Sequence, residues 1–496
     1  MPPQSQPSAV EDLNTSAPTA NSQVIAVDLD GTLVLTDTLY ESVLQLFKQA
    51  VFSILLFPLW LLQGKAAFKS KIAERVSLNP ALLPYNQALI DWLIERRVSG
   101  KKIVLTTAAD QRIATAVAEH VGLFDEVLAS DGTTNNASSN KSQFLDERFG
   151  KNCWDYAGNS QADLAVWKAA NSAIVVNANA AVLQKAQQQG NVSLVLPAAK
   201  VTALDFLKVI RLHQWLKNLL LFIPLLAAHQ IANWDALSTL LVAFISFSFC
   251  ASAVYIANDL LDLDSDRQHP RKRLRPFASG VVSVQVGCLL TPILALLSLV
   301  LALWVGHAFT AWLVFYFVVT TAYTLWLKKL VLVDCLTLAG LYTLRIIAGA
   351  AAVSVPVSFW LLAFSVFIFL SLAFVKRLAE LQAQADAGGN TAHGRGYMVS
   401  DQSLIQTLGV TAGYAAVLVL ALYLHSDSVL NLYAQPELIW LAVPLMLFWV
   451  SWIWMKAHRG QMHDDPIVFA IKDKASLAVA SLVLLSFVLA SKGFAN

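Results

Sequence analysis

The sequence predicts a protein of two structural classes, with an α/β domain at the N-terminus and an all-α transmembrane bundle at the C-terminus. Hydrophobic residues make up 56% of the 496 residues and charged residues only 14%, which is too apolar for an ordinary soluble chain. Long apolar segments are concentrated after residue 205, whereas residues 23–200 alternate short apolar strands with helical stretches. We therefore expect an α/β domain over residues 23–200 and a membrane domain over residues 205–496.

The first 22 residues are rich in Pro, Ser, Gln, Asn and Ala, and they lack both a basic start and an apolar core. This composition predicts a disordered tail and not a signal peptide. One of the four cysteines falls in the α/β part and three fall in apolar segments, so no disulfide framework is indicated. The net charge of +2 is uninformative as a total, and its distribution along the chain matters instead.

The α/β domain is predicted from three short apolar strands, over residues 24–27, 102–106 and 173–177. Helical stretches separate them, and this alternation indicates a parallel sheet covered by helices. Asp28 and Asp30 follow the first strand directly, at the carboxyl end where an open parallel sheet binds its ligand. Two carboxylates at this spacing can divide the work of phosphoryl transfer, since one can attack phosphorus while the other moves the proton of the leaving group.

The run DLDGT at residues 28–32, with the strand before it, resembles the first motif of the haloacid dehalogenase (HAD) superfamily. Members of that superfamily have a Rossmann-like fold and are mostly Mg2+-dependent phosphatases with an aspartyl-phosphate intermediate. The resemblance implies that Asp28 is the nucleophile and a metal ligand, and that Asp30 is the general acid/base and a further metal ligand. Later motifs of the superfamily imply that Thr107 and Lys141 are phosphate ligands. They also imply that Asn159 and Asp163 are metal ligands.

Asn159 departs from the HAD pattern, which has an acidic residue at the first position of this fourth motif. An amide oxygen can still ligate Mg2+, but the change removes one negative charge from the site. Two interpretations of the domain therefore stay open. It is an active phosphatase, or it is a degenerate domain that only binds a phosphate or steadies the membrane part.

The segment between the first two motifs, at about residues 36–100, has the length of the helical cap that shapes many HAD sites. Within it, residues 51–62 are apolar on all sides but too short to span a bilayer. One interpretation is a buried cap helix. The other is an interfacial segment that dips into the lipid, with Lys65, Lys69 and Lys71 at the headgroups. We favour the second, because a cap offers little core in which to bury so many large side chains.

The C-terminal part contains nine apolar segments of spanning length. They lie near residues 212–230, 236–257, 281–305, 308–327, 331–353, 357–375, 403–425, 437–456 and 475–492. Lys and Arg are concentrated in the connections after the second, fourth, sixth and eighth segments. By the positive-inside rule these connections and the α/β domain are cytoplasmic, and the C-terminus lies outside. We therefore expect a multi-pass protein of the cytoplasmic (inner) membrane.

An acidic cluster follows the second of these segments. Asp259, Asp262 and Asp266 are spaced so that a helix would place all three on one face. Such a face repels itself unless it holds a cation, and carboxylate oxygens favour Mg2+, which commonly bridges to a substrate phosphate or diphosphate. Because unpaired charge at a membrane edge is costly, the cluster predicts a diphosphate-binding site at the membrane surface.

Residues 205–496 resemble the UbiA superfamily of intramembrane prenyltransferases along their whole length. The matching features are nine helices, an NDxxDxxxD motif at residues 258–266 and a YxxxK-like motif that begins at Tyr323. The second Asp-rich motif of that superfamily is missing after the sixth segment. The expected loop there, which begins at residues 374–381, carries Lys376, Arg377 and Arg395 instead. These cations favour direct binding of phosphate without a metal.

One subgroup resembles this chain in particular, namely decaprenyl-phosphate phosphoribosyltransferase and its relatives. The resemblance rests on residues 211–218, 269–280 and 464–470. It implies transfer of 5-phosphoribosyl from phosphoribosyl diphosphate to a polyprenyl phosphate. Asp259 and Asp262 would be the catalytic residues, and Asp259, Asp262 and Asp266 would hold Mg2+. The expected substrate-binding residues are Lys217, Asn258, Lys272, Arg273, Arg275, Tyr323, Lys328, Arg345, Lys376, Arg377, Arg395, Tyr397 and Asp465.

The product of that transfer would carry a 5-phosphate monoester, which a phosphatase on the same chain could remove locally. The expected partners are therefore the two substrates and the membrane, and no nucleic acid is expected. One alternative is a conventional aromatic prenyltransferase with an accessory or degenerate HAD domain, against which the missing second Asp motif argues. Another is a membrane-anchored phosphate-binding scaffold, which would leave the Asp cluster without a role.

Overall fold

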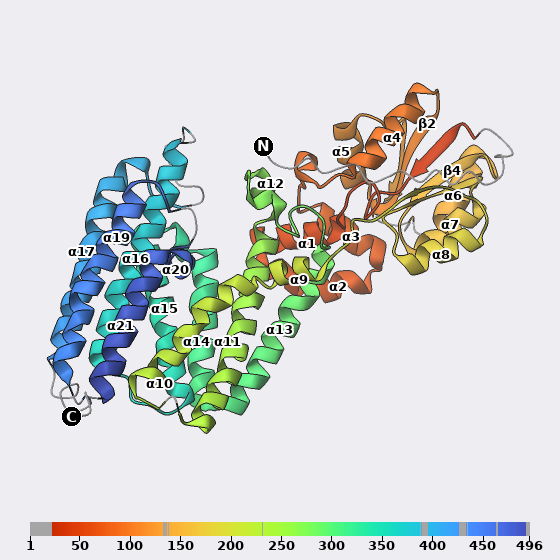
Figure 1. Ribbon diagram of the computed structural model, residues 1–496. Coiled ribbons are helices and arrows are strands. Elements are labelled where there is room, and N and C mark those ends of the chain that lie inside the picture. Colours follow the sequence, from red (N-terminus) through yellow and green to blue (C-terminus); the bar gives the residue numbers. More distant parts are fainter. Residues whose placement is uncertain are drawn as a thin grey trace. The chain divides into compact units, whose positions relative to one another are not determined.

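The computed structural model describes residues 22–131, 136, 138–230, 232–386, 388, 395–425, 433, 435–462 and 465–492 (Figure 1). The expected disordered tail therefore lies almost entirely outside the described residues. The chain forms two compact units. The first unit contains residues 1–210 together with 256–291, and the second contains residues 211–255 together with 292–496.

A six-stranded parallel sheet is the centre of the first unit, in the order β3-β2-β1-β4-β5-β6. This is the Rossmann-like order of a doubly wound sheet, so the predicted fold class is confirmed. The predicted strands are present, although the second continues beyond Thr106 to Asp110. The strands are β1 Val24–Val27, β2 Lys102–Asp110, β3 Glu126–Ser130, β4 Trp154–Gly158, β5 Ser172–Val176 and β6 Val192–Leu196.

Helices cover both faces of this sheet, because successive strand residues point to opposite sides. Ile25 and Val27 of β1 pack in one apolar cluster with α4 (Gln87–Val98) and α5 (Gln111–Val121). Val24 and Ala26 pack in the other cluster with helices on the opposite face. Those helices are α6 Ser139–Phe149, α7 Leu164–Ala169 and α8 Ala180–Gln188, and the short η3 Gln161–Asp163 precedes α7.

A small helical cap between β1 and α4 has a core of its own, formed by Leu46, Trp60, Ile72 and Val76. The range expected for the cap also included α4, which packs on the sheet instead. The cap elements are α1 Thr38–Gln49, η1 Val51–Leu56, α2 Phe57–Leu62, α3 Lys65–Ala73 and η2 Pro80–Leu82.

The cap is joined, within the first unit, to the connection between two spanning helices. Arg267 donates two hydrogen bonds to the carboxylate of Glu41 on α1, at 2.6 and 2.8 Å. Both side chains are almost fully buried, with 6% and 4% exposure. Gln285 donates to Asp37, the N-cap of α1, at 2.8 Å. The cap is thereby held against residues 267–285, which lie between α11 (Trp234–Leu261) and the first turn of α13 (Val284–Val305).

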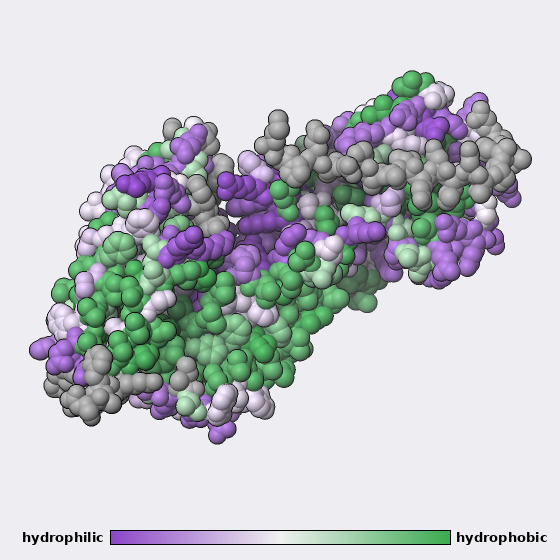
Figure 2. Space-filling model, in the orientation of Figure 1, coloured by the Kyte–Doolittle hydropathy of each residue, from purple (hydrophilic) through white to green (hydrophobic). Residues whose placement is uncertain are grey.

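The described residues include eight helices that are long and apolar enough to cross a membrane. Large apolar side chains on these helices, such as Leu289, Trp304 and Leu418, are exposed, which fits contact with lipid and not with water. Figure 2 shows hydrophobic residues along the flank of the bundle and hydrophilic residues towards its ends. Besides α11 and α13, the eight are α14 His307–Leu325, α15 Val333–Ala352, α16 Phe359–Asp386, α17 with its preceding turn Val399–Leu424, α19 with its preceding turn Glu437–His458, and α21 Lys474–Ser491. The protein is an integral membrane protein.

The first of the nine expected spans is not one continuous helix. The chain forms a 3-10 helix, η4 (Leu212–Phe222), and then a short helix, α10 (Ile223–Ala227). Asn218 is fully buried and donates to Ser248 at 2.9 Å, and Pro224 has no backbone N–H to continue a helical ladder. This segment therefore has a buried polar contact and a proline where an ordinary spanning helix would have an unbroken apolar surface. Shorter helices complete the chain, namely α9 Ala203–Val209, α12 Leu263–Gln268, η5 Lys272–Leu274, η6 Leu327–Lys329 and α20 Pro466–Lys472.

A second correction concerns residues 374–381, which were expected to be a loop. They are helical, because α16 continues to Asp386. Arg377 lies inside that helix with no exposed surface and is paired with Asp334 and Glu380. Because Asp334 and Glu380 neutralise the charge of Arg377, this residue can lie inside the helix, and α16 continues past the basic residues.

Candidate functional site

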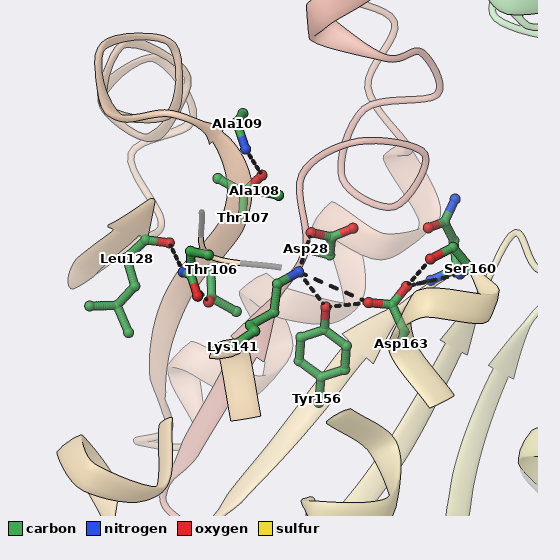
Figure 3. A network of polar contacts seen from close by, with 12 residues as sticks. Asp28, Thr106, Thr107, Ala108, Ala109, Leu128, Lys141, Tyr156, Ser160 and Asp163 are labelled. Carbon is green, nitrogen blue, oxygen red and sulfur yellow. Dashed lines mark hydrogen bonds and ion pairs between the residues drawn. The ribbon is translucent and has the colours of Figure 1, made fainter. Parts of the chain in front are cut away.

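The HAD-like site is built at the carboxyl end of β1, where Asp28 is 8% exposed. Lys141, in the first turn of α6, donates to Asp28 at 2.8 Å and to the hydroxyl of Tyr156 at 2.8 Å (Figure 3). The Tyr156 hydroxyl in turn donates to Asp163 at 2.7 Å. Residues that are far apart in the sequence therefore meet in one buried polar network.

Burial raises the pKa of Asp28 to about 6, although the charge of Lys141 opposes the rise. Burial and the charge of Asp37 raise the pKa of Asp30 to about 7. Asp30 also accepts a hydrogen bond from the backbone N–H of Thr38, the first residue of α1, at 2.8 Å. A carboxyl group whose pKa lies near neutrality can both donate and accept a proton, as a general acid/base requires.

The remaining expected HAD residues lie beside this network. Thr107 is 1% exposed and its hydroxyl accepts from the N–H of Ala109 at 3.0 Å. It lies within β2, at the place where the pairing of β2 with β3 shifts register. Asn159 lies against Gly31, where a Cβ atom would approach its side-chain nitrogen to 2.0 Å. Because Gly31 also has φ of +76°, only glycine suits this position of the motif.

Two contributors to this site were not identified from the sequence. Tyr156 comes from β4, a strand that the sequence pattern did not reveal. Lys69 of α3 was expected at the lipid headgroups, but it donates to the carbonyl of Ala108 at 2.7 Å and lies near the charges of Asp28 and Asp30. A cavity of about 60 Å3 opens here, lined by Asp30, Asp37, Thr38, Leu39, Ser42, Lys69, Ala109, Asp110 and Ile113.

The acidic cluster in the first unit is paired with a basic side chain, Arg275. The Nη1 atom of Arg275 lies 2.9 Å from Asp259 and 2.6 Å from Asp266. The two carboxylates converge even though α11 ends at Leu261, with Asp262 at the junction before α12. Burial raises the pKa of Asp266, while the charge of Arg275 opposes that shift. The three aspartates are thus not on one continuous helix, but two of them still face a common positive charge.

Residues flanking this cluster take different positions. Asn258 is half-buried near the end of α11, and its carbonyl accepts from the N–H of Asp262 at 2.9 Å. Lys272 and Arg273 form the short η5 and are exposed. Arg275, at the end of the basic run, instead turns towards the acidic cluster and pairs with it directly.

A basic cluster in the second unit contains three expected residues. Lys217 lies 2.6 Å and Lys376 lies 3.5 Å from the same oxygen of Asp465. Burial opposes ionisation of Asp465, but the two lysines outweigh it and lower the pKa of Asp465 to about 2. Two cations against one anion leave a net positive charge, which suits a phosphate group. Asp464, the neighbour in the motif, lies outside the described residues.

Arg377, Arg395, Tyr323 and Tyr397 were expected to bind substrate, and the structure brings them together around Asp334. Arg377 and Arg395 lie 2.6 and 2.9 Å from the same Asp334 oxygen, and Tyr397 donates to its other oxygen at 2.8 Å. The hydroxyl of Tyr323 accepts from Arg395 at 3.1 Å. Glu380 pairs with both arginines. Asp334 and Glu380 were not identified as site residues from the sequence. The position of Asp334 in the first turn of a predicted span could have indicated that a buried cation lies near it.

Arg345 is also enclosed within the second unit. Its guanidinium donates to Asn218 and to the hydroxyl of Tyr316, at 2.9 Å in each case, and to the carbonyl of Leu341. It is 4% exposed and is stacked among aromatic rings. Lys328 lies half-buried in η6. For these two residues a substrate-binding role stays a prediction.

The donor atoms of both acidic sites suit Mg2+. Within the described ranges, no three His, Cys, Asp or Glu side chains are grouped as a metal site. The HAD-like site nevertheless offers oxygen donors, including the Asn159 amide, and its buried carboxyls have raised pKa values that a nearby divalent cation would relieve. At the other site, the position of the Arg275 guanidinium between two carboxylates marks a place complementary to positive charge.

A doubly wound domain with paired aspartates, joined to spanning helices with an acidic connection, defines an integral membrane enzyme. The chain belongs to the UbiA prenyltransferase family, which residues 219–491 match. It is 35% identical to the protein y4nM of Sinorhizobium fredii over 93% of this chain and 90% of that one. It is 38% identical to the nodulation protein NoeC of Azorhizobium caulinodans, over 56% of this chain and 91% of the relative.

A decaprenyl-phosphate phosphoribosyltransferase of Mycolicibacterium smegmatis is 32% identical over 54% of this chain and 86% of its own length. Among solved structures, a UbiA homologue from Archaeoglobus fulgidus bound to DMAPP and Mg2+ aligns with a TM-score of 0.45 and 16% identity, over 58% of this chain and all of that one. A phosphoserine phosphatase aligns with a TM-score of 0.27 and 14% identity, over 36% of this chain and 93% of that one.

Proposed function

We propose that the membrane domain transfers a 5-phosphoribosyl group from phosphoribosyl diphosphate to a polyprenyl phosphate, and that the HAD-like domain then removes the 5-phosphate. One observation carries the proposal. The chain keeps the acidic cluster at Asp259 to Asp266, but where the family's second Asp-rich motif is expected it has Lys376, which shares a single carboxylate, Asp465, with Lys217. This arrangement suits one metal-bound diphosphate and a second phosphate bound directly by cations. The similarity to relatives named decaprenyl-phosphate phosphoribosyltransferase supports the same choice of substrates.

In the transfer step, an oxygen of the polyprenyl phosphate attacks C1 of the sugar while the bond from C1 to the diphosphate oxygen breaks. Mg2+ held by Asp259, Asp262 and Asp266 would supply positive charge to the departing pyrophosphate. Lys217 and Lys376 are placed to hold the acceptor phosphate, since together with Asp465 they carry a net positive charge. The other expected contacts, including Asn258, Lys272 and Arg273, remain part of this proposal.

In the phosphatase step, a carboxylate oxygen of Asp28 attacks phosphorus, and Asp30 gives its proton to the 5-oxygen of the leaving ribosyl lipid. Water then attacks the aspartyl phosphate, with Asp30 now accepting the proton. Lys141 holds Asp28 in place at 2.8 Å, and Lys69 adds a positive charge at the cavity beside Asp30. We place this domain and the acidic connection on the cytoplasmic side of the inner membrane, and the C-terminus outside, because of the distribution of Lys and Arg.

The proposal is tested with purified protein in lipid nanodiscs, supplied with polyprenyl phosphate, phosphoribosyl diphosphate and Mg2+. Mass spectrometry of the lipids is expected to show a ribosyl product without the 5-phosphate. Phosphoribosyl diphosphate should be consumed only when polyprenyl phosphate is present. Prenylation of 4-hydroxybenzoate from a prenyl diphosphate, without transfer of ribose, would instead establish an aromatic prenyltransferase.

Asn159→Asp is expected to increase the phosphatase rate at limiting Mg2+. A carboxylate at this position restores the negative charge that HAD phosphatases have there, and so should tighten cation binding. The measurement is the rate of phosphate release as a function of Mg2+ concentration. The control is Asn79→Asp in the same unit, because residue 79 is exposed and a carboxylate can still accept the hydrogen bond from the N–H of Ala81. An unchanged Mg2+ dependence in Asn159→Asp would show that residue 159 does not contact the metal.

A further inference from the structure

The apolar segment Val51–Leu62 of the cap, formed by η1 and α2, presents a set of large exposed side chains. Phe52, Leu55 and Leu62 are 81%, 77% and 85% exposed, and Leu59 and Leu61 are more than half exposed. Trp60 of the same segment is 3% exposed and forms part of the cap core. The segment is therefore anchored from within while its other side remains uncovered, which is costly for a surface in water.

The same structural unit contains the ends of two membrane spans. Gln285, in the first turn of α13, donates to Asp37 at the start of α1, and Arg267 is paired with Glu41 further along α1. Residues of α13 within this unit, such as Leu289 at 65% exposure, are exposed apolar side chains on a helix long and apolar enough to cross a membrane. Since the apolar segment follows α1 directly, it belongs to the same unit as these ends of two helices of spanning length.

The charges around the segment favour a lipid surface over a protein partner. Lys48 precedes the segment, Lys65 follows it, and both are exposed. No Asp or Glu occurs from residue 48 to residue 73. Large apolar side chains flanked by cations are typical of segments that lie in the interface of a bilayer with anionic lipids.

We propose that residues 51–62 insert into the cytoplasmic lipid interface and hold the HAD-like site at the membrane surface. The insertion of this segment into lipid does not depend on the proposed function. Only its consequence for the substrate class of the phosphatase rests on that function. The cap that carries the apolar segment also carries Lys69, which lines the cavity beside Asp30. A phosphatase whose cap is seated in lipid meets phosphates borne by lipids in preference to dissolved ones, because both are confined to one surface.

The location is tested by spin labels on the full-length protein in nanodiscs of zwitterionic and anionic lipids. Leu62→Cys and Val98→Cys are made in a Cys153→Ser background, which removes the exposed native thiol. Val98 is the matched control, because it is 84% exposed at the end of α4 in the same unit. The label at residue 62 is expected to be relaxed mainly by oxygen, and the label at residue 98 mainly by a water-soluble nickel chelate. This result does not depend on any enzyme activity.

Two outcomes would overturn the proposed location. Nickel access at residue 62 equal to that at residue 98 would place the segment in water. Shielding of residue 62 from both reagents would indicate a protein surface, such as a second copy of the chain.

The substrate class is tested with Leu59→Gln/Leu62→Gln in the same nanodiscs. Dephosphorylation of the phosphoribosyl lipid is expected to fall about tenfold, while hydrolysis of p-nitrophenyl phosphate stays the same. An equal loss with both substrates would contradict the role of the segment in substrate choice. If wild-type protein shows no phosphatase activity while residue 62 is in lipid, the proposed function fails and the membrane contact stands.

Discussion

Asp259→Ala is expected to abolish transfer of phosphoribose to the lipid, with a loss of at least about a hundredfold. Asp259 and Asp266 approach one positive charge from two sides, at 2.9 and 2.6 Å from Arg275. Removing one carboxylate halves the negative charge of this pair and so weakens a bound Mg2+ that stabilises pyrophosphate. The measurement is the formation of labelled ribosyl lipid, with Mg2+ varied over a wide range.

The matched control for this prediction is Asp264→Ala, which removes a half-buried carboxylate from the same segment outside the set of expected metal ligands. Asp264→Ala should retain transfer, and both variants should retain the elution profile of the folded protein. If Asp259→Ala turned over at the wild-type rate in saturating Mg2+, the acidic cluster would not be the metal site of the transferase. Chelation of divalent cations should likewise stop transfer by the wild-type protein.

Asp28→Asn is expected to leave lipid phosphoribosylation intact and to make the 5-phosphorylated lipid accumulate. The substitution keeps the size of the side chain but removes the charge that Lys141 binds at 2.8 Å, and an amide cannot serve as the attacking nucleophile. Loss of the phosphatase step should therefore be at least about a thousandfold. Mass spectrometry of the lipid products gives the ratio of phosphorylated to dephosphorylated lipid.

Asp91→Asn, which changes an exposed carboxylate on α4 of the same unit, serves as the control and should give the wild-type ratio. The same ratio in wild type and Asp28→Asn would exclude the HAD-like domain as the phosphatase. Its role would then be limited to binding a phosphate or supporting the membrane domain.

Strong local patterns allowed most of the fold class to be predicted from the sequence. The buried strand before Asp28 and the long apolar segments are such patterns, and both are present in the structure. Strands β3, β4 and β6 were missed because polar residues, such as Glu126, Asp155 and Ser193, interrupt their apolar pattern. Without β4, the position of Tyr156 between Lys141 and Asp163 could not be inferred.

The sites were harder to predict than the fold, because sequence spacing does not say which charges meet in space. Arg275 is paired with Asp259 and Asp266, and its expected role in substrate binding did not indicate these partners. Arg377 was expected in the loop after the sixth apolar segment, yet it lies inside α16, where Asp334, far from it in the sequence, neutralises its charge. In both cases the partner of a charged residue is fixed by tertiary packing, which no local pattern contains.

The buried pair between Glu41 and Arg267 has a consequence for how such a chain can change during evolution. The two residues lie on opposite sides of the boundary between the HAD-like sequence and the membrane sequence, and each is almost fully buried. Loss of one partner would leave an uncompensated buried charge, at a cost of about 3–5 kcal/mol. Substitutions at the two positions should therefore be inherited together. If the two halves were separated into chains that no longer met, both charges would return to water and the coupling between the two positions would end.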